Sequence, residues 1–143
     1  MHSRNRNRLV ALTPLAFALV AMSAQAASRV DLHQLDVAQV NHQYALASTS
    51  VGAAAQPRLK HAEMLGLDAN SALHQLAATR DSNGTVHYRY QQTFRGVPIF
   101  GEHVIVSEDR SGKVRNMFGR AVNGLAGELP ATSPRLAGAQ ALS

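Results

Sequence analysis

The side chains best suited to metal or acid–base chemistry are histidines, and they stand far apart in the chain. Beyond residue 26 these are His33, His42, His61, His74, His87 and His103. A hydrolytic site of the His-Glu-x-x-His type would place two imidazoles on one helix face, with the glutamate beside a metal-bound water. No such sequence occurs, and no two histidines share a short metal-ligand spacing. We expect these histidines to lie on the surface or in turns.

The sequence also lacks the motifs of a nucleophilic active site. The chain contains no cysteine and no Gly-x-Ser-x-Gly elbow. Glu102 and Glu108 fall in a predicted strand and a predicted turn, where the default expectation is a solvated carboxylate. We therefore expect no catalytic residue, no metal site and no cofactor in this chain.

The polar residues Arg89, Gln91 and Thr93 alternate with apolar ones and would share one face of a strand. One interpretation is ordinary cross-strand pairing, as for Gln92 with Glu102 on the opposite face. The other is a polar contact surface that faces a partner. The residues alone leave both open.

The stretch from His87 to Ser107 predicts two antiparallel strands. Aromatic residues recur with period 2 up to Phe94, and a second apolar run covers Ile99 to Val106. Gly96 accepts positive φ and Pro98 has no N–H, so strand pairing is expected to stop between the runs. A one-residue slip would move the apolar set to the wrong face. The favoured register therefore pairs Tyr88 with Val106, Tyr90 with Val104, and Phe94 with Phe100.

Other segments predict a helix and further strands. Residues 56–66 form a helix candidate with Pro57 in its first turn, apolar residues at helical spacing, and Gly66 as its cap. Strands are expected at about 72–79, 85–94 and 114–122, with turns at 80–84 and 108–113. The predicted fold is α+β, with one helix packed on a four-stranded antiparallel meander.

Residues 1–26 have the three parts of a secretory leader. Arg4, Arg6 and Arg8 precede an uncharged apolar run, and an Ala-x-Ala site ends at Ala26. We predict cleavage between Ala26 and Ala27, and a secreted or periplasmic product. Beyond the leader, eleven basic residues stand against nine acidic ones, a formal charge of +2, which gives no case for nucleic-acid binding or for a membrane once the leader is removed.

The flanks of the predicted domain are polar or rich in small residues. Residues 27–55 are interpreted as a weakly ordered N-terminal arm and linker, in which Leu32, Leu35 and Val37 would pack on the domain. The domain itself is assigned to residues 56–123. Residues 124–143 are expected to be a flexible linker that leads to the start of another helix.

The sequence Tyr-Arg-Tyr-Gln-Gln-Thr-Phe-Arg-Gly-Val-Pro-Ile-Phe-Gly, residues 88–101, resembles the core motif of the fungalysin/thermolysin propeptide domain. That domain precedes the catalytic part of secreted M4-type zinc metallopeptidases. The motif positions that carry the resemblance are Tyr88, Tyr90, Phe94, Gly96, Pro98, Phe100 and Gly101. The family's arrangement is similar to the cystatin-like α+β fold, and residues 124–143 would open its second prodomain half.

The resemblance implies a prodomain fragment that assists folding of a metallopeptidase and holds it inactive until processing. Zinc, and calcium with it, would belong to the parent's catalytic domain, bound in cis or in trans. Partner contacts are expected at Arg89, Gln91 and Arg95. The alternative is a stand-alone exported binding or inhibitor module, and an enzyme in its own right would need a catalytic set that the sequence lacks.

Overall fold

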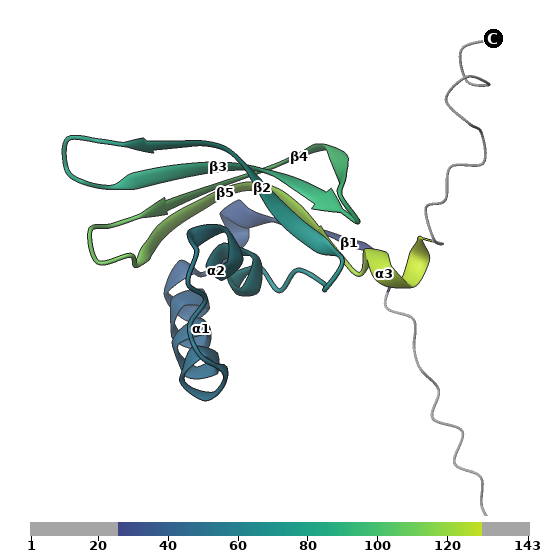
Figure 1. The fold of residues 1–143 in the computed structure, drawn as a ribbon, viewed down its shortest axis with the longest axis horizontal. Helices are drawn as coiled ribbons and strands as arrows, with labels where there is room; N and C mark the ends of the chain where they lie inside the picture. Colours follow the sequence, from purple (N-terminus) through teal and green to yellow (C-terminus); the bar gives the residue numbers. More distant parts are fainter. Residues whose placement is uncertain (1–25, 130–143) are drawn as a thin grey trace, which may run out of the picture.

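One antiparallel sheet of five strands, in the order β1-β5-β4-β3-β2, forms the frame of the structure, a computed structural model that describes residues 26–129 (Figure 1). The strands are β1 (Ser28–Asp31), β2 (Ser71–Arg80), β3 (Val86–Phe94), β4 (Val97–Glu108) and β5 (Val114–Asn123). The meander β2 to β5 follows the sequence expectation. The expected count of four strands is wrong, because β1 pairs with the outer edge of β5. The predicted leader, residues 1–25, and the flank 130–143 lie outside the described residues.

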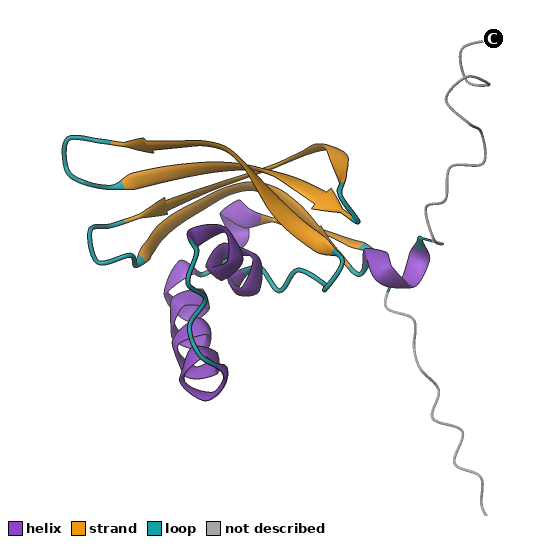
Figure 2. Ribbon diagram, in the orientation of Figure 1, coloured by secondary structure: helices purple, strands orange, loops and turns teal. Residues whose placement is uncertain are grey.

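The helices gather on one face of the sheet, as the purple ribbons of Figure 2 show. They are the short η1 (Leu32–Gln34), α1 (Val37–Val51), α2 (Pro57–Met64) and the single turn α3 (Leu125–Glu128) at the sheet end. Helix α2 is the predicted one. It begins with Pro57 in its first turn and ends where Gly66 takes a positive φ of 63°. Gly66 N donates to Glu63 O and Leu67 N to Ala62 O, the bond pair of a Schellman motif.

The expectation of weak order before residue 56 is wrong for residues 28–51. Asp36 begins α1 as its N-cap, since its carboxylate accepts hydrogen bonds from Ala38 N and Gln39 N. Helix α1 has no fully buried residue, but Val37, Val40 and Tyr44 recur at helical spacing and are half-buried on one face. The predicted packing of Leu32, Leu35 and Val37 against the domain is confirmed, with Leu32 fully buried.

The hairpin between β3 and β4 is tighter than predicted. Tyr88 pairs with Val106 and Tyr90 with Val104, as expected. Phe94, however, pairs with Val97 rather than with Phe100, because Arg95 and Gly96 form a two-residue turn with both φ angles positive, 49° and 79°. Pairing therefore continues through Pro98, opposite Thr93, where the sequence predicted that it would stop.

A large irregular bulge in β4 accounts for the difference between the predicted and the observed pairing of Phe94. Gln91 pairs with His103 and Thr93 with Pro98, so residues 99–102 of β4 stand opposite Gln92 alone. Gly101 has a φ of 77°, which bends the backbone outward. Phe100 lies at this bend and is 100% exposed, contrary to its expected place within the sheet.

The core lies between the sheet and the helices. Tyr90 is fully buried at its centre, which confirms that this ring faces the helices. Its buried partners are Leu32, Leu65, Leu73, Val104, Val106, Val114, Met117 and Ala121. Leu59 on α2 and Phe118 on β5 lie outside this core and are 48% and 38% exposed.

Replacing Tyr90 should therefore be costly. Tyr90→Ala leaves a cavity and removes the partner of His61, and it should lower the free energy of unfolding by about 3–5 kcal/mol. Arg95→Ala, at the exposed turn, should lower it by less than about 1 kcal/mol. Urea denaturation followed by circular dichroism measures both. A larger loss for Arg95→Ala than for Tyr90→Ala would contradict the assigned facing of β3.

Candidate docking surface

The side chain of Gln92 connects β3 to β5 across the bulge. Its Nε2 donates to Val122 O at 2.7 Å, and its Oε1 accepts from Val122 N at 2.8 Å. These are the backbone groups that β4 would bind if it did not bulge. Gln92 is fully buried, so the two hydrogen bonds replace strand pairing where β4 leaves the sheet. The expected pair of Gln92 with Glu102 is not formed.

Gln91 holds the bulge from the other face of β3. Its Nε2 lies 2.7 Å from Ile99 O and 3.1 Å from Glu102 O, so one amide group binds both ends of the bulge. Adjacent glutamines thus perform two different structural tasks. Gln91, one of the predicted partner contacts, is only half exposed and already bound to backbone.

Glu102 is buried at the base of the bulge, not solvated as expected. It is 1% exposed, with Arg29 Nε at 2.7 Å from its Oε1 and Arg120 Nε at 3.7 Å from its Oε2. Strands β1 and β5 supply the two arginines, so the predicted arm takes part in fixing the bulge. The two arginines compensate the charge of this buried carboxylate.

Apolar side chains surround the turn and the bulge. Val97 is 55% exposed and Pro98 is also exposed, while Phe100 is fully exposed. Beside them an open pocket of about 240 Å³ is lined by Phe94, Val97, Pro98, Ile99, Leu125 and Leu129. Exposed apolar side chains gathered around a fixed turn are typical of a docking surface rather than of a reaction site. We call Val97, Pro98, Ile99 and Phe100 the bulge surface.

The predicted contacts Arg89 and Arg95 lie in different places. Arg95 is in the turn itself, with its guanidinium carbon 4.9 Å from the centre of the Phe94 ring, so it adjoins the bulge surface. Arg89 is exposed on the face of the sheet opposite the helices, as its alternation with Tyr88 and Tyr90 requires. The structure therefore brings Arg95, but not Arg89, next to the exposed apolar residues.

A buried polar network lies under α2, and the sequence did not reveal it. His61 Nδ1 is 2.8 Å from the Tyr90 hydroxyl, and His61 Nε2 is 2.8 Å from Glu108 Oε1. Lys60 also contacts Glu108 and donates to Gly112 O at 2.6 Å. His61 and Glu108 were expected on the surface but are 0% and 5% exposed. The signal available in the sequence was the i, i+4 spacing of His61 on α2 and Leu65 at its C-cap, which places both on the buried side.

The ionisation of this network follows from its burial. Burial and the nearby Tyr88 and Glu108 raise the pKa of Tyr90 far above its usual range, so Tyr90 stays a neutral phenol. Burial alone would raise the pKa of Glu108, but hydrogen bonds from His61 and Lys60 outweigh it and lower the pKa. With no solvent access to the imidazole, the network joins α2 to the sheet rather than acting on a substrate.

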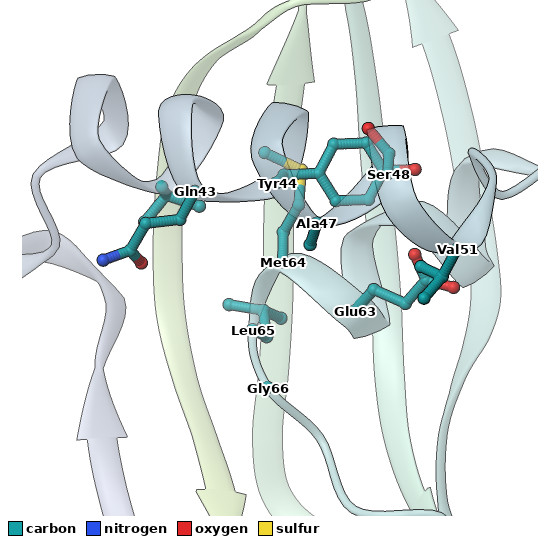
Figure 3. A pocket seen from close by; sticks show the side chains of 10 residues that line it. Gln43, Tyr44, Ala47, Ser48, Val51, Glu63, Met64, Leu65 and Gly66 are labelled. Carbon is teal, nitrogen blue, oxygen red and sulfur yellow. The ribbon is translucent and has the colours of Figure 1, made fainter.

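An open hollow of about 570 Å³ lies between α1 and α2 (Figure 3). Tyr44 lies beside Met64 there, and Glu63 is the carboxylate at its edge. Within residues 26–129, no group of three or more histidine, aspartate or glutamate side chains is placed to hold a metal ion. None of the described helices is long and apolar enough to cross a membrane.

Comparison with known proteins places part of this chain in a described sequence family. Residues 72–121 match the model of the Fungalysin/Thermolysin Propeptide Motif, a span that includes β3, the bulge and most of β5. The chain is 35% identical over 80 residues to the transglutaminase-activating metalloprotease of Streptomyces mobaraensis. It is 34% and 38% identical over 61 residues to the hemagglutinin/proteinase of Vibrio cholerae and the neutral protease of Vibrio proteolyticus.

These alignments cover 56% of this chain for the first relative and 43% for the other two, and 10% of each relative. The segment 72–121 is therefore a fungalysin/thermolysin propeptide motif, which confirms the resemblance carried by residues 88–101. The proteins that share it are metalloprotease precursors of the thermolysin type.

The buried network predicts a pH-dependent stability. Glu108→Gln removes the charge that Lys60 and His61 contact, and it should lower the free energy of unfolding by about 1–3 kcal/mol at pH 7. Because folding lowers the pKa of Glu108, this stabilisation is fully present above the unfolded-state pKa of about 4.3 and is lost as pH falls through the folded value. The two proteins should converge below pH 4 in urea denaturation.

The matched control is Glu63→Gln, an exposed carboxylate on α2, the helix that carries Lys60 and His61; this change should leave stability almost unchanged at every pH. A gap between wild type and Glu108→Gln that stayed constant from pH 7 to pH 3 would contradict the assignment of the charge to this network.

Proposed function

We propose that this chain is the first part of a prodomain that helps a thermolysin-like metallopeptidase domain to fold and holds it inactive until processing. The propeptide motif at residues 72–121 supports the class of partner. The observation that carries the proposal is the bulge surface, where a fully exposed phenylalanine stands on a backbone held by Gln91 and by the ion pairs of the buried Glu102.

The energetics favour a docking role for Phe100. Burying a phenylalanine side chain contributes about 1.5–3 kcal/mol, and this chain forgoes that gain in its own core. The backbone around Phe100 is held by Gln91 and by the Glu102 ion pairs, so little conformational entropy remains to be lost when a partner binds. An aromatic side chain on a pre-ordered backbone of this kind fits the centre of a protein interface.

The charges around the bulge surface suit an acidic partner surface. Arg95 adjoins the apolar residues, and Arg89 extends the positive charge over the open face of the sheet. Such charges steer association and fix orientation more than they add affinity. Gln91 contributes by holding the bulge in place. Zinc and calcium would be bound by the catalytic domain of the parent protease.

The proposal places the protein outside the cytoplasm. The leader would be cleaved between Ala26 and Ala27, and the prodomain would meet the catalytic domain, in cis or in trans, in the periplasm or the medium. The chaperone and inhibitor roles and the export route rest on the propeptide motif and on the predicted leader.

A direct test mixes residues 27–143 with a mature thermolysin-like protease from the same organism. Casein hydrolysis measures inhibition, and regain of activity after dilution from denaturant measures assisted folding. We expect the wild-type prodomain, at micromolar concentration, to slow casein hydrolysis and to increase the regain of activity. Phe100→Ser should weaken inhibition by roughly tenfold or more, which corresponds to about 1.4 kcal/mol of lost interface burial.

The matched control is Leu46→Ser, which removes an apolar side chain that is 61% exposed on α1, away from the bulge. It should inhibit like wild type. Failure of the folded wild-type protein to change either activity would overturn the proposal. Tight binding with no effect on hydrolysis or refolding would instead favour a stand-alone binding module.

A further inference from the structure

A second feature lies at the edge strand β1, where the chain enters the sheet. An open pocket of about 450 Å³ is lined by Ala26, Ser28, Gly66, Asp68, Asn123 and Gly124. We call it the Asp68 pocket. It lies where the start of β1 meets α3 at the end of the sheet (Figure 1).

Two oxygen atoms of this pocket are buried without a hydrogen-bond partner among the described residues: Asp68 Oδ1 and Asn123 Oδ1. Asn123 Nδ2 donates to Leu65 O at 3.2 Å, so the amide is oriented with its oxygen left as an acceptor. Asp68 Oδ2 accepts from Ala126 N at 3.4 Å, which leaves Oδ1 to the pocket. Both free atoms are acceptors, so a ligand of this pocket should be a hydrogen-bond donor. Because Asp68 is a carboxylate, a cationic donor would bind best.

The Ala26–Ala27 peptide bond lies at this pocket. Gly124 has a φ of 80°, and a Cβ there would be 3.0 Å from Ala26 O and 3.4 Å from Ala27 Cα. The backbone of the predicted cleavage site thus passes directly over Gly124, and Ala26 and Ser28, on either side of Ala27, both line the pocket that contains the two free acceptors. Other charged side chains nearby do not offer a cation, since Arg29 and Arg120 contact Glu102 and Glu128 is acidic and exposed on α3.

We propose that the Asp68 pocket binds the α-ammonium group created at Ala27 when the leader is removed. Hydrolysis of the Ala26–Ala27 bond leaves the new carboxylate on the departing Ala26 and an amine on Ala27, which takes up a proton. The uncharged amide nitrogen of the precursor becomes a cation with three donors, next to Asp68 Oδ1 and Asn123 Oδ1. Processing therefore supplies the ion pair that the pocket lacks.

The contact would pin β1, the strand whose Arg29 helps to bury Glu102 and whose continuation places Leu32 in the core. A chain that still carries its leader cannot form it. The domain would then be less stable before export than after, which suits export of an unfolded precursor. This inference rests on the predicted cleavage site and is independent of any effect on a protease.

The experiment compares three forms of residues 27–143: a free amine at Ala27, the same chain N-acetylated, and the chain with one added N-terminal glycine. At pH 6.5 the free-amine form should have the highest Tm, by roughly 2–6 °C, the shift expected for about 1 kcal/mol or less in a domain of this size. In Asp68→Asn the three forms should melt together. Glu128→Gln, a neighbouring carboxylate outside the pocket, should keep the full difference.

The pKa of the amine gives a second readout that needs no variant. Pairing should raise it above the usual range of about 7.7–8.0, so the Tm advantage should persist below that range and disappear as pH rises through the folded value. Equal Tm values for the three forms, an advantage that survives in Asp68→Asn, or an amine that titrates in the usual range would each overturn the proposal.

Discussion

The pair of hydrogen bonds between the Gln92 side chain and the backbone of Val122 is the constraint on which the rest of the sheet depends. Strand β4 cannot leave the sheet unless the backbone groups it abandons on β5 are satisfied, since a buried unpaired N–H or C=O costs about 1–3 kcal/mol. Gln92 satisfies both with one amide. Val122 is paired with β1 on its other side, so the same residue also fixes where the arm joins the sheet.

The candidate function follows from that constraint. With β5 satisfied by Gln92, residues 99–102 are released from pairing, and Gln91 and the buried Glu102 hold them in one shape. Phe100 is then presented to solvent on a fixed backbone, beside the apolar turn residues. The motif that is shared with metalloprotease precursors thus has a physical consequence, an exposed aromatic side chain on an ordered backbone outside the domain's own core.

The sequence predicted the local patterns better than the long-range ones. The period-2 face of β3, the register at Tyr88 and Tyr90, and the capped helix α2 were all correct, because each depends on neighbours in the chain. The bulge was missed because Ile99 and Phe100 look like strand residues, and only contacts 30 residues away, at Val122, show that β4 leaves the sheet. Helix α1 was missed because its half-buried face mixes the apolar Val37, Val40 and Tyr44 with polar residues, which weakens the helical pattern in the sequence.

The burial of polar residues was the other feature that the sequence did not predict. His61, Gln92, Glu102 and Glu108 were each expected to be solvated or paired across strands, and each is almost fully buried. Their partners come from different elements: α2, β5, and the arginines of β1 and β5. A single sequence gives no sign of such pairings, whereas the turn at Asn83-Gly84 and the strand alternation are visible from residue types alone.

The exchange rate of the Val122 amide hydrogen tests the central claim most directly. In Gln92→Leu, which keeps side-chain size but has no amide, that hydrogen should exchange at least tenfold faster than in wild type, relative to core amides such as Val106. Gln75→Leu, the same change at an exposed position on β2, should leave it protected. A Val122 amide that stayed as protected in Gln92→Leu as in wild type would contradict the account, because β5 would then not depend on Gln92.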